Sequence, residues 1–274
     1  MKKIILAFDG THFSAGAFEF ARRLNELQPV LLTGVFMPQV ALANLWSYSG
    51  NAGSTFIPLV ENSESELVQQ NIERFEKLCQ ANGIDYRVHK DFYNFALQEL
   101  KSESRYADLV ILGSEVYYEN IGTKNGPNNF LQDAVHEVTC PVLLVPEKFD
   151  FPRSIILAYD GSESSVYAIK QFAYLFPELC NKDVLLLYAS DDPTKKIPDE
   201  LQIEELAARH FSNLSLFKLN INPKKFFHTW VLEKKSAMLI SGSYGRTGLS
   251  RLFKKSFVSE VIRDHRIPVF IAHK

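Results

Sequence analysis

Short runs of consecutive apolar residues alternate along this chain with segments in which apolar residues recur every three or four positions. Continuous apolar runs are typical of strands buried on both faces of a parallel sheet, and the three-to-four spacing is typical of amphipathic helices. The first half of the chain has runs that predict strands at 4–8, 29–36, 85–89, 108–113 and 141–146. Helical spacing from Phe13 to Leu24 lies between the first two runs. The predicted repeating unit is therefore strand, helix, strand.

The pattern occurs twice. Residues 2–24, KKIILAFDGTHFSAGAFEFARRL, align without a gap with residues 153–175, RSIILAYDGSESSVYAIKQFAYL. The segments ADLVILGS and CPVLLVP of the first half have the counterparts SAMLISGS and IPVFIAH in the second. Each copy is too long to be one unit of a solenoid, so the sequence predicts a duplicated domain. We place the two domains at 1–148 and 149–274.

Strands that alternate with helices predict an α/β fold with right-handed crossovers. The predicted architecture is two similar three-layer α/β/α sandwich domains, each with a mostly parallel five-stranded sheet. Ligands of such sheets bind in the crevice beyond the carboxyl ends of the strands. Candidate binding residues are therefore sought immediately after the apolar runs.

Composition narrows the classes of partner and compartment. The chain is 46% hydrophobic with a formal net charge of −2, so it has no overall positive field to attract nucleic acid or an acidic membrane. The first apolar run ends at Asp9, too early for a signal peptide, and no window is long enough to span a membrane. Cys79, Cys140 and Cys180 fit neither a disulfide framework nor paired zinc ligands. We expect a cytoplasmic protein that contacts neither nucleic acid nor membrane.

Glycines follow the apolar run at 237–240. Gly242 and Gly245 come directly after it, and a helix is predicted to start near Ser256. Glycine allows a close approach of backbone to ligand, and the start of a helix attracts phosphate, to which Ser256 would add a hydroxyl. Alternatively, the glycines only form a turn and Ser256 caps its own helix. Basic residues nearby either steer a phosphate or form a solvated helix face; they are Arg246, Arg251, Lys254 and Lys255.

Asp160 follows the first predicted strand of the second half. Parallel strands bring their carboxyl ends to one edge, so this carboxylate can share a crevice with the glycines. It can accept hydrogen bonds from ribose hydroxyls or an amino group. It can also cap the helix predicted to start near Ser164, and the two roles are compatible.

Catalytic and metal-binding patterns find little support. Ser241 to Gly245 approaches a nucleophile elbow, but serine replaces its first glycine, and His265 falls in the predicted last helix. Neither a Walker loop nor a G-x-G-x-x-G motif is present. The seven histidines lack ligand spacing with carboxylates. We expect no catalytic residue and no metal site of the protein's own.

The second half contains a set of spaced motifs. Asp160-Gly161-Ser162 follows its first strand, Gly242-Ser243-Tyr244-Gly245 follows a later one, Lys255-Ser256 comes nine residues on, and Pro268-Val269 opens the last strand. These motifs, with GRTGLSRL at 245–252, resemble those of the universal stress protein family. The resemblance covers nearly the whole chain, and the pair of halves is similar to a tandem member of that family.

This resemblance implies an adenine-nucleotide site and a fold like that of the adenine nucleotide alpha hydrolases. Asp160 and Ala189 would lie near the adenosine, and Gly242, Gly245 and Ser256 near the phosphates of ATP, with Mg²⁺ accompanying the nucleotide. Arg246 would add positive charge. Lys255 stands where the family has glycine, so its Cβ would obstruct the phosphates or its ammonium would bind them. At most, weak ATP hydrolysis is implied.

The first half departs further from the pattern. Val116 stands where the second glycine should be, and Asn128-Asn129 replaces the last Gly-Ser pair. Asn129 with Gln132 is typical of a helix cap, a structural role. We therefore predict that this half lacks the phosphate site. Its long connection at 41–63, with Trp46 and Tyr48, is either a lid or interaction loop or a disordered segment.

Two functions follow. The chain is either a stress-response regulator that binds adenine nucleotide in its second domain, or a scaffold that binds none and acts through protein contacts. The resemblance also predicts that the final strands, Pro141 to Val145 and Val269 to Ala272, pair within the chain as a pseudo-dimer. A further homo-oligomer is compatible with both functions.

Overall fold

The structure, a computed structural model, describes residues 1–37, 62–90, 96–115, 129–222, 226, 229–231, 233–234, 236–242 and 264–273. The chain forms two compact units. The first unit comprises Met1–Leu112 and Val116–Thr139, and the second comprises Gly113–Glu115 and Cys140–Lys274.

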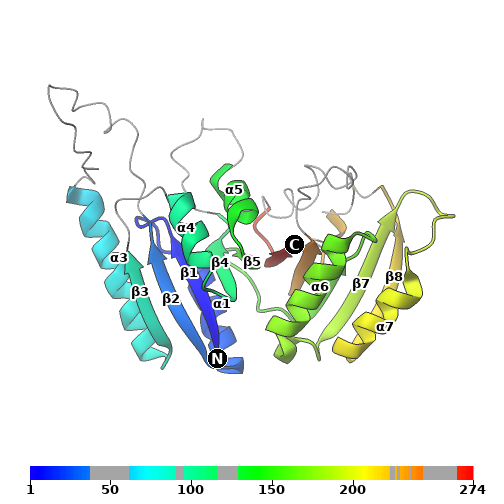
Figure 1. Cartoon of the computed structure of the whole chain (residues 1–274), viewed down its shortest axis with the longest axis horizontal. Helices are drawn as coiled ribbons and strands as arrows, with labels where there is room; N and C mark the ends of the chain where they lie inside the picture. The colour runs from blue at the N-terminus through cyan, green and yellow to red at the C-terminus, as the bar shows by residue number, and fades with distance from the viewer. Residues whose placement is uncertain are drawn as a thin grey trace, which may run out of the picture. The chain divides into compact units, whose positions relative to one another are not determined.

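The first unit alternates strands with helices (Figure 1). Its elements are β1 (Lys2–Phe8), α1 (Ala15–Leu27), β2 (Val30–Phe36), α3 (Asn62–Ala81), β3 (Asp85–Lys90), α4 (Ala96–Ser104), β4 (Leu109–Gly113) and α5 (Asn129–Glu137). The strands lie in the order β3-β2-β1-β4 and all pair in parallel. Because crossovers are right-handed and the winding reverses after β3, α1 and α3 cover one face and α4 the other.

The core of the first unit is aromatic next to the carboxyl end of β1. Phe8 stacks on Phe36 with ring centroids 4.7 Å apart, and Phe75 of α3 meets both rings edge-on. Gly34 of β2 leaves the room for this cluster, because a Cβ there would lie 2.9 Å from the Phe75 ring. Phe75 thus packs α3 against the ends of β1 and β2.

The second unit repeats the pattern. Its elements are β5 (Val142–Val145), β6 (Ser154–Ala158), α6 (Glu163–Leu175), η1 (Pro177–Leu179), β7 (Asp183–Ser190), α7 (Glu200–His210), β8 (Asn213–Asn220), β9 (Ala237–Gly242) and β10 (Val269–Ala272). The strands lie in the order β5-β10-β9-β6-β7-β8 and pair in parallel, except that β5 is antiparallel to β10. The mostly parallel α/β architecture predicted from the sequence is thus confirmed.

The predicted strands of the first half agree with β1 to β5 within two residues at each end. The expected pairing of the two final strands is present, with Val269 opposite Leu144 and Ile271 opposite Val142. Through this pairing β5 belongs to the second unit. The domain boundary at 148 and the pseudo-dimer stay predictions, because the division of the chain into compact units tests neither of them.

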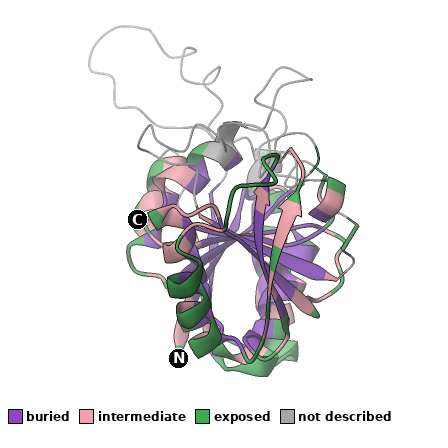
Figure 2. Ribbon diagram, turned by 90° about the vertical axis from the view of Figure 1, so that its right-hand side faces the viewer, coloured by how far each residue is buried: buried purple, intermediate pink, exposed green. Residues whose placement is uncertain are grey.

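Buried residues gather along the strands, and the outer faces of the helices are exposed (Figure 2). One expectation about an element is wrong: His265 lies in a turn with φ of 46°, not in a helix. Its Nδ1 lies 2.9 Å from Oγ of Ser114. Within the described part of the chain, no helix is both long and apolar enough to cross a membrane.

Candidate functional site

The carboxyl end of β6 carries the predicted aspartate. Tyr159 is buried, whereas Asp160 is half-buried. Oδ1 of Asp160 accepts a hydrogen bond of 2.9 Å from N–H of Ser162, and no described residue donates to its Oδ2. Capping of α6 is performed by Ser162, whose Oγ accepts from N–H of Ser165 at 3.2 Å. The helix cap expected of Asp160 therefore belongs to Ser162, and Oδ2 of Asp160 accepts no hydrogen bond from the described residues.

Gly161 lies between these two residues under two constraints. Its φ of 80° is in the left-handed region, which favours glycine, and a Cβ there would lie 2.7 Å from the ring of Pro198. Pro198 is fixed in turn, because its carbonyl accepts a hydrogen bond of 2.9 Å from the Tyr159 hydroxyl. The segment before α7 is thus held against the turn between β6 and α6.

Tyr159 has a pKa above its ordinary value. Burial is the main cause, and the carboxylates of Asp199 and Asp160 add to it by opposing the phenolate. The carboxylates of Asp199 and Asp160 therefore lie close enough to the Tyr159 hydroxyl to raise its pKa. The negative charge at the end of β6 suits groups that donate hydrogen bonds, such as hydroxyl and amino groups, better than it suits phosphate.

Gly242 ends β9 against the first turn of α6. A Cβ on Gly242 would lie 2.4 Å from the carbonyl carbon of Ser164 and 2.5 Å from N of Ser165. A real Cβ never comes that close to backbone, so any other residue at 242 would displace β9 or α6. Gly242 therefore has a packing role that is independent of any ligand.

The predicted residues are partly brought together. Asp160 bonds to Ser162, and Gly242 touches Ser164, so both lie at the start of α6. Ala189 is half-buried near the carboxyl end of β7, the neighbour of β6 in the sheet. The other members of the predicted site lie outside the described residues; they are Gly245, Arg246, Lys255 and Ser256.

The equivalent position in the first unit is closed. Asp9 is only 5% exposed. Its Oδ1 accepts hydrogen bonds from N–H of Thr11 at 3.0 Å and of His12 at 2.8 Å, and its Oδ2 lies 2.9 Å from Nδ1 of His12. Both oxygens of this carboxylate are therefore occupied by the protein's own groups.

Aromatic and polar side chains cover the same loop. Phe13 stacks on Phe8 at 4.9 Å, and the Arg74 guanidinium lies 4.2 Å above the Phe13 ring. Asn71 donates hydrogen bonds to the carbonyls of Gly10 and Thr11. The end of β1 is thus filled by residues of the chain itself.

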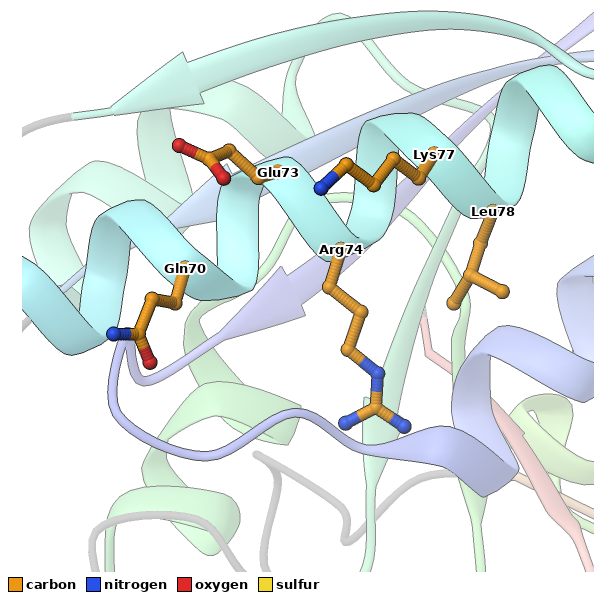
Figure 3. Close-up of a pocket in the computed structure, with 5 residues that line it drawn as sticks. All are labelled: Gln70, Glu73, Arg74, Lys77 and Leu78. Carbon is orange, nitrogen blue, oxygen red and sulfur yellow. The ribbon is translucent and has the colours of Figure 1, made fainter.

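A depression of about 440 Å³ lies beside this loop and is lined by Gln70, Glu73, Arg74, Lys77 and Leu78 of α3 (Figure 3). Arg74 projects from α3 towards the loop between β1 and α1 (Figure 3). None of the site residues predicted from the sequence lines this depression. Within the described residues, no group of three or more histidine, cysteine, aspartate or glutamate side chains could hold a metal ion.

Similarity to known proteins is found in structure but not in sequence. No sequence-family model matches the chain, and no curated protein does. A universal stress protein from Archaeoglobus fulgidus DSM 4304 superposes with a TM-score of 0.68 at 16% identity, over 100% of this chain and 96% of the other. A putative universal stress protein from Pseudomonas aeruginosa UCBPP-PA14 superposes with a TM-score of 0.54 at 15% identity, over 100% of this chain and 93% of the other. The chain has the universal stress protein fold.

That fold is also found in a protein that is not described as a universal stress protein. The cytoplasmic domain of a prokaryotic cation chloride cotransporter superposes with a TM-score of 0.56 at 10% identity, over 98% of this chain and 94% of the other. The universal stress protein fold by itself therefore does not determine what this chain binds. The chemistry of the residues at the end of β6 is more specific than the fold.

Within the universal stress protein fold, the sequence did not predict the contact of Tyr159 and Gly161 with Pro198. One signal was available: a glycine after an aspartate at the end of a strand is typical of a left-handed turn. The partner of that turn is far along the chain, and no local pattern could have identified Pro198.

Proposed function

We propose that this chain is a stress-response protein of the universal stress protein kind, and that it binds ATP or a related adenine nucleotide in its second unit, at the carboxyl ends of β6, β7 and β9. The observation that carries this proposal is the difference between Asp160 and Asp9. Among the described residues nothing donates to Oδ2 of Asp160, whereas both oxygens of Asp9 are occupied.

The residues at the end of β6 fit the nucleoside end of such a ligand. Oδ2 of Asp160 can accept a hydrogen bond from a ribose hydroxyl or from the adenine amino group. The N–H groups of Glu163 and Ser164 in the first turn of α6 have no acceptor among the described residues, as is usual at a helix start. Glu163 places an exposed carboxylate there, which disfavours phosphate at this position.

The phosphates would then lie towards the residues that follow β9. Backbone already fills the space between Gly242 and the first turn of α6, so no phosphate fits between them. Gly245, Arg246, Lys255 and Ser256 would hold the phosphates, with the ammonium of Lys255 in place of a backbone amide. Mg²⁺ would accompany the nucleotide as a phosphate-bound ion. This chain's residues would bind and orient the nucleotide, with at most weak hydrolysis.

Binding is tested by native mass spectrometry of freshly purified protein and by calorimetry with ATP, ADP and GTP. We expect one adenine nucleotide per chain and weaker binding of GTP, because an aspartate that accepts from the adenine amino group finds a carbonyl in guanine. Absence of binding at millimolar nucleotide would contradict the proposal. That result would favour the scaffold that acts through protein contacts alone.

A further inference from the structure

β8 is the end strand of the second unit, and no described strand pairs with its outer edge. It pairs only with β7, in a continuous parallel register from Asp183 opposite Asn213 to Ser190 opposite Asn220. No other strand of the described chain pairs with it. Figure 2 looks from this side of the molecule, and the residues of β8 are half-buried or exposed. Eight residues without a bulge or a proline form a regular edge.

The two end strands in the described structure differ in charge. β3, the end strand of the first unit, has the sequence DYRVHK with Asp85, Arg87 and Lys90 in six residues. Charged side chains are the usual protection of a free sheet edge against pairing with another chain. β8 has the sequence NLSLFKLN, and Lys218 is its only charged residue. β3 is therefore protected by charge, and β8 is not.

Lys218 does not protect the edge. Its Nζ donates a hydrogen bond of 2.7 Å to the carbonyl of Pro193, in the segment between β7 and α7. This bond ties the ammonium to its own unit. The neighbouring Phe217 is 45% exposed, so a large apolar ring faces solvent on a strand whose edge carries no free charge.

From this edge we infer that the chain forms a symmetric dimer in which β8 of one copy pairs in antiparallel fashion with β8 of a second copy. In antiparallel strands, directly opposite side chains lie on the same face of the sheet. Under a two-fold axis perpendicular to the sheet, this condition holds only if one residue of β8 lies opposite the same residue of the second copy. Phe217 is the best candidate for this central position, because its exposed ring would be covered by the Phe217 ring of the second copy.

Charge and residue type suit this register. With Phe217 opposite itself, Lys218 lies opposite Leu216, and Ser215 opposite Leu219. No like charges meet, and the central pair is aromatic, which stabilises antiparallel strands. The same operation on β3 centred on Arg87 would set two guanidinium groups against each other. A second copy is therefore the occupant that the β8 edge fits.

The dimer closes with two copies and does not use the residues at the end of β6. It therefore goes beyond the proposed nucleotide function. Dimerisation can be present whether or not nucleotide binds, so failure of one proposal leaves the other standing.

The test is a charge swap at the centre of the pairing, read by light scattering coupled to size-exclusion chromatography over a concentration series. The unchanged protein should reach twice the 31.2 kDa chain mass. Phe217→Glu and Phe217→Lys should each shift to the single-chain mass, because like charges then face each other. Mixing the two variants in equal amounts should restore the double mass.

Tyr174→Glu is the matched control, because Tyr174 is 57% exposed on α6 of the same unit and should leave the dimer unchanged. Thermal melting of each variant checks that the second unit still folds. A single-chain mass for the unchanged protein at every concentration would overturn the inference. A dimer that survives both charged variants, or a mixture that stays monomeric, would overturn it equally.

Discussion

Asp9 and Asp160 occupy equivalent positions of the repeat, yet their carboxylates have different partners. Asp9 is held by Thr11 and by backbone and ring of His12, whereas Asp160 accepts one hydrogen bond from Ser162. The difference follows from the residue three positions after each aspartate, which is His12 in one half and Glu163 in the other. A histidine ring can donate to the carboxylate, and a glutamate cannot.

The same substitution at both positions separates binding from stability. Asp160→Asn keeps the oxygen that accepts from Ser162 but removes the charge, so we expect little change in stability and a 10-fold or greater loss of nucleotide affinity, since a hydrogen bond to a charged group contributes about 1.5–3 kcal/mol. Asp9→Asn should leave affinity unchanged and lower the free energy of unfolding by about 1–3 kcal/mol. Calorimetry and chemical denaturation measure the two effects, and unchanged affinity in Asp160→Asn would disprove the site.

Gly242 makes a second prediction at this scale. Gly242→Ala places a Cβ against the backbone of α6, so it should lower the free energy of unfolding by about 2–3 kcal/mol. Gly83→Ala is the control, because Gly83 has φ of 62° but nothing within 4 Å of an added Cβ. It should cost about 1 kcal/mol from backbone strain alone. Equal losses in urea denaturation would show that Gly242 is not tightly packed.

Residue patterns could predict that an aspartate and a glycine meet at one edge of the sheet, because parallel strands require it. They could not predict which glycine is needed for packing. Gly242 is fixed by the backbone of Ser164, which is 78 positions away, and only tertiary structure reveals the contact.

At the scale of elements, the two copies start their first helix at different points. Residue 2 aligns with 153, so Thr11 corresponds to the cap Ser162, but the cap of α1 is Ser14, three residues later. Asp9 holds the N–H groups of Thr11 and His12, which would otherwise begin the helix. One turn of helix is thereby replaced by a closed loop.

Matched changes at the two aligned positions test this difference. Ser162→Ala removes the cap of α6 and should lower the free energy of unfolding by about 1 kcal/mol. Thr11→Ala removes a hydroxyl that lies 3.3 Å from Oδ1 of Asp9 and 3.1 Å from Nδ1 of His12, and it should cost less than half as much. Thermal or chemical denaturation gives both values. A larger loss for Thr11→Ala would mean that the first half also depends on capping at this position.

Sequence periodicity predicted the strands well, because their apolar runs are continuous and bounded by polar residues. The ends of helices were harder, since Asp, Ser and Thr all lie in the same short stretch and each is a good cap. His265 was assigned to a helix although it lies in a left-handed turn, and its contact with Ser114 has no local signature.

At the scale of the whole molecule, buried thiols predict sensitivity to alkali. Burial raises the pKa of Cys180 to about 11 and that of Cys79 to about 12, from a model-compound value of 9.0. The folded state binds these protons more tightly than the unfolded state, so the stability is fully present below pH 9 and is lost as pH rises through 11 and 12. Each thiol contributes a slope of about 1.4 kcal/mol per pH unit. Cys180→Ala should flatten the curve between pH 9 and 11, and parallel curves for the two proteins would contradict this.

The place of β5 in the second unit predicts how the chain can be divided. A fragment of residues 140–274 keeps the pairing of β5 with β10, whereas a fragment of residues 149–274 exposes the edge of β10. We expect the longer fragment to melt at a higher temperature and to stay soluble at higher concentration, since a free apolar edge favours aggregation. Equal melting temperatures would mean that the β5 pairing adds little.

The strand order of the second unit also constrains the time at which it can fold during synthesis. β10 lies between β5 and β9 in the sheet, and it follows both of them along the chain. β5 emerges more than a hundred residues earlier and has to wait for its partner. Until β10 has emerged, β5 and β9 each present an unpaired apolar edge, and the nascent protein is exposed to mispairing and to chaperone binding for that interval.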